Sequence, residues 1–222
     1  MVAVQRRRHG GTASLACMPS AAHNGRVFEF LPQTGRIADA RWLPSPNCDE
    51  RPADTVVNML VLHCISLPPG EFGGSAIDAL FGNTLDTGAH PYYAQLDGLQ
   101  VSAHFLVARD GRLTQYVDCD ERAWHAGVSR FCGQSSCNDF SVGIELEGTE
   151  DRAYADAQYA TLVPLVLALR RRYPALRQGP TVGHSDIAPG RKTDPGPSFD
   201  WQRLHRELAR SLASTVIDGA AA

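Results

Sequence analysis

Residues Thr55–His63 form a nearly continuous apolar run, and this run constrains the fold more than any other segment. It reads TVVNMLVLH, is rich in β-branched residues and has the length of a strand rather than that of a helix. A run without apolar–polar alternation is typical of a strand that is buried on both faces. We therefore predict a central strand here, with His63 at its carboxyl end.

Other patterns indicate the elements around this strand. Apolar residues at helical spacing predict helices, and an Asp-Gly pair between two apolar runs predicts a β-hairpin. The Gly- and Pro-rich segment 64–98 is longer than an ordinary loop and is expected to be functional. The expected elements are a short helix over 75–81, hairpin strands over 101–108 and 113–117, a strand over 140–147, a helix over 156–172 that kinks or starts late because of Pro164, and a last helix over 200–212.

Length and composition favour one domain with a tail at each end. The chain has 222 residues, of which 43% are hydrophobic and 20% charged, as in an average globular protein. Residues 1–34 are rich in Arg, Gly, Ala and Ser without apolar periodicity, so we predict a disordered N-terminal extension. The domain is expected over 35–212, followed by a C-terminal tail over 213–222.

Charge and cysteine usage exclude several classes of partner. A formal net charge of −3 gives no basic footprint for nucleic acid. No apolar run approaches the roughly 18 residues of a membrane helix, and the first segment lacks the apolar core of a signal peptide. The six cysteines form no CxxC pair. A disulfide between Cys132 and Cys137 is the less favoured alternative to six reduced thiols, so we expect a cytoplasmic protein.

Three separated residues could form a metal site. His63 ends the central strand, His184 lies in VGHSD and Asp194 lies in KTDPGP. Two imidazoles and one carboxylate are the ligands of many catalytic zinc sites, which keep a fourth position open for water. Histidines and aspartates in loops are more often capping or hydrogen-bonding groups, so the residue types alone leave both interpretations open.

Further residues are candidates for acid–base and electrostatic roles. Glu145 lies mid-strand, where a carboxylate is costly to bury unless it is paired or used, so it is either a general base or part of a solvated face. Glu147 is expected at the strand rim. Lys192, in a turn stiffened by prolines, could stabilise an oxyanion or be an ordinary surface lysine. Trp124 and His125 could face a substrate or pack inside.

Taken together, these residues resemble the AmpD-type N-acetylmuramoyl-L-alanine amidases, cytoplasmic zinc enzymes of bacterial cell-wall recycling. The resemblance is collinear over about residues 35–205, which makes it more specific than any single motif. The segments that carry it are VLHCISLPPGEFGG (61–74), VSAHFLVARDG (101–111), RAWHAGVS (122–129), CNDFSVGIELEGTED (137–151) and GHSDIAPGRKTDPGPSFDW (183–201).

The resemblance implies a fold, a reaction and a set of roles. The fold is α/β, a single domain with a mixed central sheet flanked by helices, as in phage-lysozyme-type amidases and peptidoglycan-recognition proteins. The reaction is hydrolysis of the amide between (1,6-anhydro-)N-acetylmuramic acid and L-alanine of the stem peptide, a small muropeptide substrate, by a monomer. The implied residues are zinc ligands His63, His184 and Asp194, general base Glu145, oxyanion-stabilising Lys192, and substrate-binding Trp124, His125, Asn138 and Arg130.

Two departures from the family pattern concern substrate binding. Gln100 and Ser136 stand where basic residues usually help to hold stem-peptide carboxylates, and Arg130 or Arg122 are the candidate substitutes. Two other functions are weighed against the recycling amidase. One is a related zinc amidase that cuts intact peptidoglycan in the envelope, and the other is a zinc-free peptidoglycan-binding module. Retention of the whole set of implied ligand and catalytic residues argues against the binding module.

Overall fold

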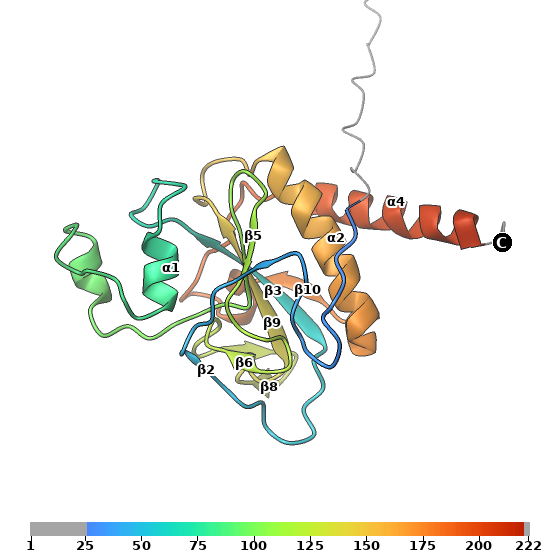
Figure 1. The fold of residues 1–222 in the computed structure, drawn as a ribbon, viewed down its shortest axis with the longest axis horizontal. Coiled ribbons are helices and arrows are strands. Elements are labelled where there is room, and N and C mark those ends of the chain that lie inside the picture. Colours follow the sequence, from blue (N-terminus) through green and yellow to red (C-terminus); the bar gives the residue numbers. More distant parts are fainter. Residues whose placement is uncertain (1–25, 220–222) are drawn as a thin grey trace, which may run out of the picture.

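A six-stranded mixed sheet forms the centre of the molecule (Figure 1). The computed structural model describes residues 26–219, so most of the predicted N-terminal extension lies outside the described residues. The strand order is β1-β5-β4-β9-β3-β10. The strands are β1 (Arg41–Trp42), β3 (Met59–Ile65), β4 (Phe105–Val107), β5 (Leu113–Gln115), β9 (Ser141–Glu147) and β10 (Thr181–Gly183).

The inner strands of this sheet run parallel. β3 pairs in parallel with β9 on one side and with β10 on the other, and β4 pairs in parallel with β9. The predicted hairpin of β4 and β5 is antiparallel, and its strands are shorter than the apolar runs suggested. Two small antiparallel sheets lie outside the main one: β2 (Cys48–Asp49) with β6 (Arg122–Ala123), and β7 (Arg130–Phe131) with β8 (Gln134–Ser135).

The two faces of the sheet are covered differently. Leu60, Leu62 and Ile144 point to one face and pack in the main core with helices α2 (Asp156–Arg172) and α4 (Trp201–Gly219). Figure 1 shows α1 (Ala76–Phe81) on the opposite side of the sheet from α2, within the long 64–98 segment. The remaining short helices are η1 (Tyr93–Leu96), η2 (Pro174–Arg177) and α3 (His184–Ile187). Because side chains alternate along a strand, His63 and Glu145 face away from α2.

The predicted order of elements is confirmed, with several differences at their boundaries. The central strand is β3, which begins four residues later than predicted and continues past His63 to Ile65. Helix α2 has the predicted bounds, Asp156–Arg172, although it contains Pro164, so the late start, one of the two alternatives expected from this proline, is wrong. Helix α4 continues to Gly219, into the predicted C-terminal tail.

The ordered domain begins before residue 35. Phe28 is only 1% exposed and belongs to the main core, and Phe30 forms a β-bridge with Ile37. The backbone carbonyl of Phe28 also accepts a hydrogen bond from Arg171 of α2 (3.1 Å). Disorder of residues 26–34 is predicted from their lack of apolar periodicity, and this prediction is wrong. The single buried side chain of Phe28 is enough to anchor them to the core.

The five described cysteines are free, so Cys132 and Cys137 form no disulfide. Cys17 lies outside the described residues. Within residues 26–219, no helix is both long enough and apolar enough to span a membrane.

Candidate active site

The parallel register of β10, β3 and β9 brings three candidate residues to one place. His63 of β3 pairs with Glu145 of β9, and Gly183, the last residue of β10, pairs with Leu62. His184 follows directly as the first residue of α3 and thus lies beside His63. Ligand-binding residues commonly gather at the carboxyl ends of parallel strands, which is where these three lie.

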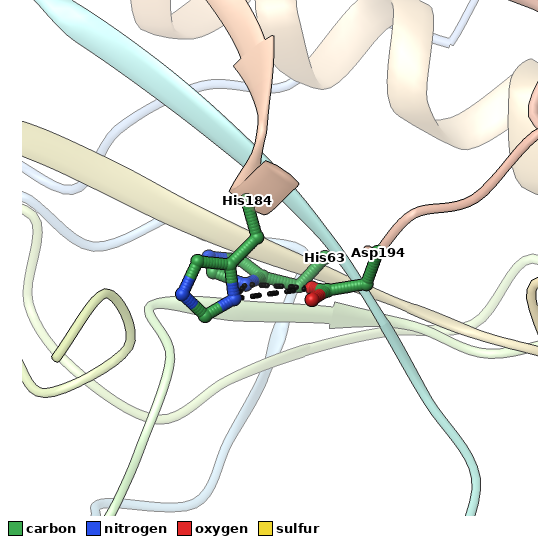
Figure 2. A group of neighbouring side chains, drawn as sticks. All are labelled: His63, His184 and Asp194. Carbon is green, nitrogen blue, oxygen red and sulfur yellow. Dashed lines mark hydrogen bonds and ion pairs between the residues drawn. The ribbon is translucent and has the colours of Figure 1, made fainter. Parts of the chain in front are cut away.

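Asp194 reaches the same point because the chain after α3 folds back on the helix. The amide of Ser185 donates a hydrogen bond to the carbonyl of Asp194 (3.0 Å), and the amide of Lys192 donates one to the carbonyl of Ala188 (3.0 Å). Figure 2 shows the three side chains pointing toward one another from β3, α3 and this returning segment. The ten-residue separation between His184 and Asp194 is therefore closed by a tight loop.

Their ligand atoms converge as a metal site requires. His63 Nδ1 lies 3.0 Å from His184 Nδ1, and Asp194 Oδ2 lies 3.2 Å from each of these nitrogens. Tetrahedral zinc, with bonds of about 2.0–2.1 Å, separates its ligand atoms by roughly 3.3 Å. Among the described residues, this is the one group of three or more His, Cys, Asp or Glu side chains arranged in this way.

The protonation of these groups also fits a cation. His184 Nε2 faces the carbonyl oxygen of Ala126 (3.1 Å) and donates its proton there. Arg191 Nη2 lies near the same nitrogen, but its two hydrogens already serve the carbonyls of Ala126 and Val128 at 2.6 and 2.7 Å. A His184 ring that carries its single proton on Nε2 presents the lone pair of Nδ1 toward the carboxylate of Asp194, and two such acceptors can share a cation.

Burial and the neighbouring side chains set the charges of the group. Burial would raise the pKa of Asp194, but its contacts with His184 and His63 lower the pKa well below the ordinary value, so the carboxylate is ionised. Burial lowers the pKa of His63 to about 4, against a smaller opposing effect of Asp194, so the imidazole is neutral at pH 7. Neutral imidazole and ionised carboxylate are the forms that bind a metal.

Glu145 stands beside this group with the properties of a general base. Its side chain is 9% exposed, and its Oε2 is buried without a hydrogen-bond partner. Burial raises its pKa well above the usual range; Asp194 adds to this increase and Lys192 opposes it. A carboxylate of raised pKa can take up and release a proton near neutral pH. The solvated strand face that the pattern also allowed is not observed.

Lys192 is exposed on the returning segment, two residues before Asp194. Its positive charge lowers the pKa of both His63 and Glu145. A cation in this position can balance negative charge that develops beside the ligands.

The four predicted substrate-binding residues lie in different surroundings. Trp124 is half-buried, and its Nε1 donates to Asp49 Oδ1 (3.1 Å). His125 is 8% exposed and both of its ring nitrogens contact protein groups. Asn138 Oδ1 accepts hydrogen bonds from the amides of His125 and Ala126 (3.1 and 2.7 Å), so it holds the turn that carries them. Arg130 is exposed on β7, beside a groove that Ser136 also lines.

Two residues have structural roles that the sequence does not predict. Glu147, expected at a rim, is 3% exposed and accepts hydrogen bonds from the amides of Gly73 (2.5 Å) and Arg109 (3.0 Å), so it ties the long segment to the sheet. The guanidinium of Arg51 bonds the carbonyls of Asn138, Asp139, Cys119 and Ser141. Neither role has a local sequence signal, because each depends on chain segments far away in the sequence.

Comparison with known proteins agrees with this geometry. Residues 53–197 match the family described as N-acetylmuramoyl-L-alanine amidase. The chain belongs to this family. It is 56% identical over 182 residues to the 1,6-anhydro-N-acetylmuramyl-L-alanine amidase AmpD of Enterobacter cloacae, a match that covers 82% of the chain and 97% of the relative. The predicted AmpD-type amidase is thereby confirmed.

Solved structures confirm the predicted fold. The amidase superposes on the crystal structure of an AmpD selenomethionine derivative with a TM-score of 0.78 and 56% identity, covering 81% of this chain and 99% of that one. A complex of the amidase AmiD from E. coli with anhydro-N-acetylmuramic acid-L-Ala-D-γ-Glu-L-Lys gives a TM-score of 0.50 at 31% identity, covering 71% and 60% of the two chains. A Drosophila peptidoglycan recognition protein, 16% identical with a TM-score of 0.51 and coverage of 73% and 84%, shares the fold alone.

Proposed function

We propose that this amidase hydrolyses the amide between 1,6-anhydro-N-acetylmuramic acid and L-alanine of the stem peptide, with zinc held by His63, His184 and Asp194. The observation that carries the proposal is the convergence of their Nδ1, Nδ1 and Oδ2 atoms within 3.2 Å, beside the buried carboxylate of Glu145. Two nitrogens and one oxygen are a ligand set suited to zinc.

Zinc in this site would polarise the scissile carbonyl and lower the pKa of water toward about 7. Glu145 accepts the proton of the attacking water and delivers it to the departing amine nitrogen. A bond forms between the water oxygen and the carbonyl carbon, and the carbon–nitrogen bond breaks, which leaves a lactyl carboxylate and the free amine of L-alanine. Lys192 stabilises the negative charge that develops on the carbonyl oxygen.

The proposed substrate is a small soluble muropeptide. This is supported by the names of the AmpD relatives and by the anhydro-muramyl peptide bound to the related AmiD. Trp124, His125 and Asn138 are proposed to form one side of the substrate site. The half-buried Trp124 would contact the substrate, whereas the buried His125 and the half-buried Asn138 would hold this part of the chain in shape. Of the two cations considered as replacements at Gln100 and Ser136, Arg122 already bonds Asp49 and Asp139, which leaves Arg130 for a stem-peptide carboxylate.

We further propose that the enzyme works in the cytoplasm as a monomer in peptidoglycan recycling. A substrate competition tests this role against cleavage in the envelope. Purified enzyme is given anhydro-muramyl tripeptide or intact sacculi, and the released peptides are followed by mass spectrometry. Rapid release of tripeptide from the soluble substrate, with sacculi almost untouched, is expected. Preferential cleavage of sacculi would instead favour the envelope amidase, and binding of either without cleavage would favour the peptidoglycan-binding module.

A further inference from the structure

His125 lies directly behind the proposed metal ligand His63, on the side away from the ligand atoms. His63 Nε2 is 2.9 Å from His125 Nδ1, and the two rings meet edge to face with centroids 5.0 Å apart. His125 Nε2 is in turn 3.1 Å from Ser141 Oγ, which lies 2.5 Å from the carbonyl oxygen of Cys137. A continuous hydrogen-bonded chain thus runs from a backbone carbonyl to a metal ligand.

The carbonyl of Cys137 determines the direction of every hydrogen bond in this series. The carbonyl of Cys137 can only accept, so the single hydroxyl hydrogen of Ser141 points to it. Ser141 Oγ must then accept from His125 Nε2, and a neutral His125 has a bare Nδ1. That Nδ1 accepts from His63 Nε2, which therefore carries the one proton of the neutral His63 ring.

These hydrogen-bond directions determine the protonation of His63 Nδ1, the atom that faces the proposed metal position. With its proton on Nε2, His63 presents a lone pair at Nδ1, the atom that lies 3.0 Å from His184 Nδ1 and 3.2 Å from Asp194 Oδ2. The opposite tautomer would put a hydrogen where the metal must bind. The direction of these hydrogen bonds thus decides whether His63 Nδ1 can bind a metal.

Strand β9 is shaped to hold His125 in this place. A Cβ at Gly143 would lie 2.4 Å from Cγ of His125, so the imidazole rests against backbone that only glycine leaves uncovered. Ser141, Gly143 and Glu145 are alternate residues on one face of β9. One strand face therefore supplies the hydroxyl that orients His125, the space for its ring and the proposed general base.

We propose that His125, oriented by Ser141, is a positioning residue that fixes His63 in the Nε2–H tautomer and so keeps its Nδ1 available to the metal. This inference rests on the proposed metal site. It assigns His125 a role toward the metal rather than a direct contact with substrate.

Replacement of His125 tests the proposal through metal affinity. His125→Phe keeps a planar ring but removes the acceptor for His63 Nε2, and we expect the zinc dissociation constant, measured by competition with a chromogenic chelator, to rise about 10–100-fold. His125→Asn places an amide oxygen near the position of Nδ1 and is expected to recover most of the affinity. Equal zinc affinity in His125→Phe and the wild type would overturn the proposal.

A matched serine pair provides the second test. Ser141→Ala removes the orienting hydroxyl and is expected to weaken zinc binding. Ser45 is an equivalent buried serine, since its Oγ donates to the carbonyl of Phe81 (2.5 Å) and accepts from the amide of Asn47 (3.1 Å), but it does not contact the histidines. Ser45→Ala is therefore expected to leave zinc affinity unchanged. Equal losses in both variants would show a general effect of a missing hydroxyl and overturn the proposal.

The tautomer itself can be read in the metal-free wild type by long-range nitrogen–proton NMR correlations of the imidazole rings. We expect a protonated Nε2 and a bare Nδ1 in His63. A proton on Nδ1 would overturn the proposal whatever the metal affinities. If the tautomer is as stated but the wild type binds no zinc, the inference about His125 stands and the proposed metal function fails.

Discussion

Glu145 is the side chain whose surroundings differ most from those that its type prefers. It projects from a buried strand near the carboxyl end, its Oε2 has no hydrogen-bond partner, and its strand neighbour is the proposed metal ligand His63. An unpaired buried carboxyl costs folding free energy, and such costs persist where the group has a function. The function that we propose for Glu145 is to accept the proton of the attacking water.

We predict that Glu145→Gln lowers kcat by at least about 100-fold, because the amide cannot accept the proton of water. Zinc affinity should be unchanged, since Glu145 is not among the proposed ligands. Steady-state hydrolysis of the anhydro-muramyl tripeptide and zinc content by atomic absorption measure the two effects. Loss of zinc together with activity would make Glu145 a ligand or a structural residue instead.

Lys192 gives a second prediction at this scale. Lys192→Met keeps the length of the side chain but removes its charge, so kcat/KM should fall by about 100- to 1000-fold if the ammonium stabilises the oxyanion. Because the residue is exposed, the free energy of unfolding should change by less than about 0.5 kcal/mol. Wild-type kinetics in Lys192→Met would show that Lys192 is an ordinary surface lysine.

At the scale of elements, the short sheet of β2 and β6 fixes the segment that leads to His125. Arg122 of β6 bonds both carboxylate oxygens of Asp49 on β2 (2.7 and 2.5 Å), and its other Nη atom bonds Asp139 (2.6 Å). The indole of Trp124 also donates to Asp49. Two strands of two residues each are thus stabilised by a bidentate ion pair rather than by a long ladder.

This ion pair predicts a pH-dependent difference in stability. Hydrogen bonding by Arg122 lowers the pKa of Asp49 in the folded state. The stabilisation is therefore fully present above the unfolded pKa of about 3.9 and is lost as the pH falls through the lower folded pKa. Arg122→Gln should unfold more easily than the wild type at pH 7, by no more than about 1 kcal/mol because the pair is partly exposed.

Urea unfolding of both proteins at neutral pH and at successively more acidic pH measures the difference. We expect it to shrink as the pH falls below about 4, where the unfolded state begins to take up the proton, and to shrink further until Asp49 is protonated in the folded wild type as well. A difference that stays constant with pH would mean that Arg122 acts through packing rather than through its ion pair.

The elements that sequence predicts well are those with enough residues to show a period. Helix α2 and strand β9 matched closely, since each repeats its apolar pattern over its whole length. Strands β2 and β6 have two residues each, too few for any pattern, and the Arg122–Asp49 ion pair that stabilises them joins residues far apart in the sequence. Phe28 was missed for the same reason, since one buried aromatic residue has no periodicity.

The candidate site divides in the same way. Residue types and the family resemblance predict the candidate site residues His63, His184, Asp194 and Glu145. The structure shows in addition that strand register brings them together. The contact between His63 and His125 could not be predicted, because it joins residues on segments that have no local relation. A glycine inside a predicted strand was the only local signal, since Gly143 marks a close approach to backbone.

At the scale of the whole molecule, the main hydrophobic core and the proposed catalytic residues lie on opposite faces of the central sheet. The face toward α2 and α4 is apolar and forms the main core. The opposite face carries His63, Glu145 and Gly143, with His184 at the end of the adjacent strand. Strands β3 and β9 therefore hold His63 and Glu145 on a rigid support, α3 holds His184 at the end of β10, and Asp194 and Lys192 come from the loop that α3 anchors.

The measurement that tests this account most directly is zinc stoichiometry together with X-ray absorption at the zinc edge, in the wild type and in Asp194→Asn. We predict one zinc per wild-type chain with two imidazole ligands, full loss of tripeptide release on chelation, and recovery when zinc is restored. Asp194→Asn should bind zinc weakly and lose activity in parallel. Full hydrolysis by metal-free enzyme, or undiminished zinc binding by Asp194→Asn, would contradict the account.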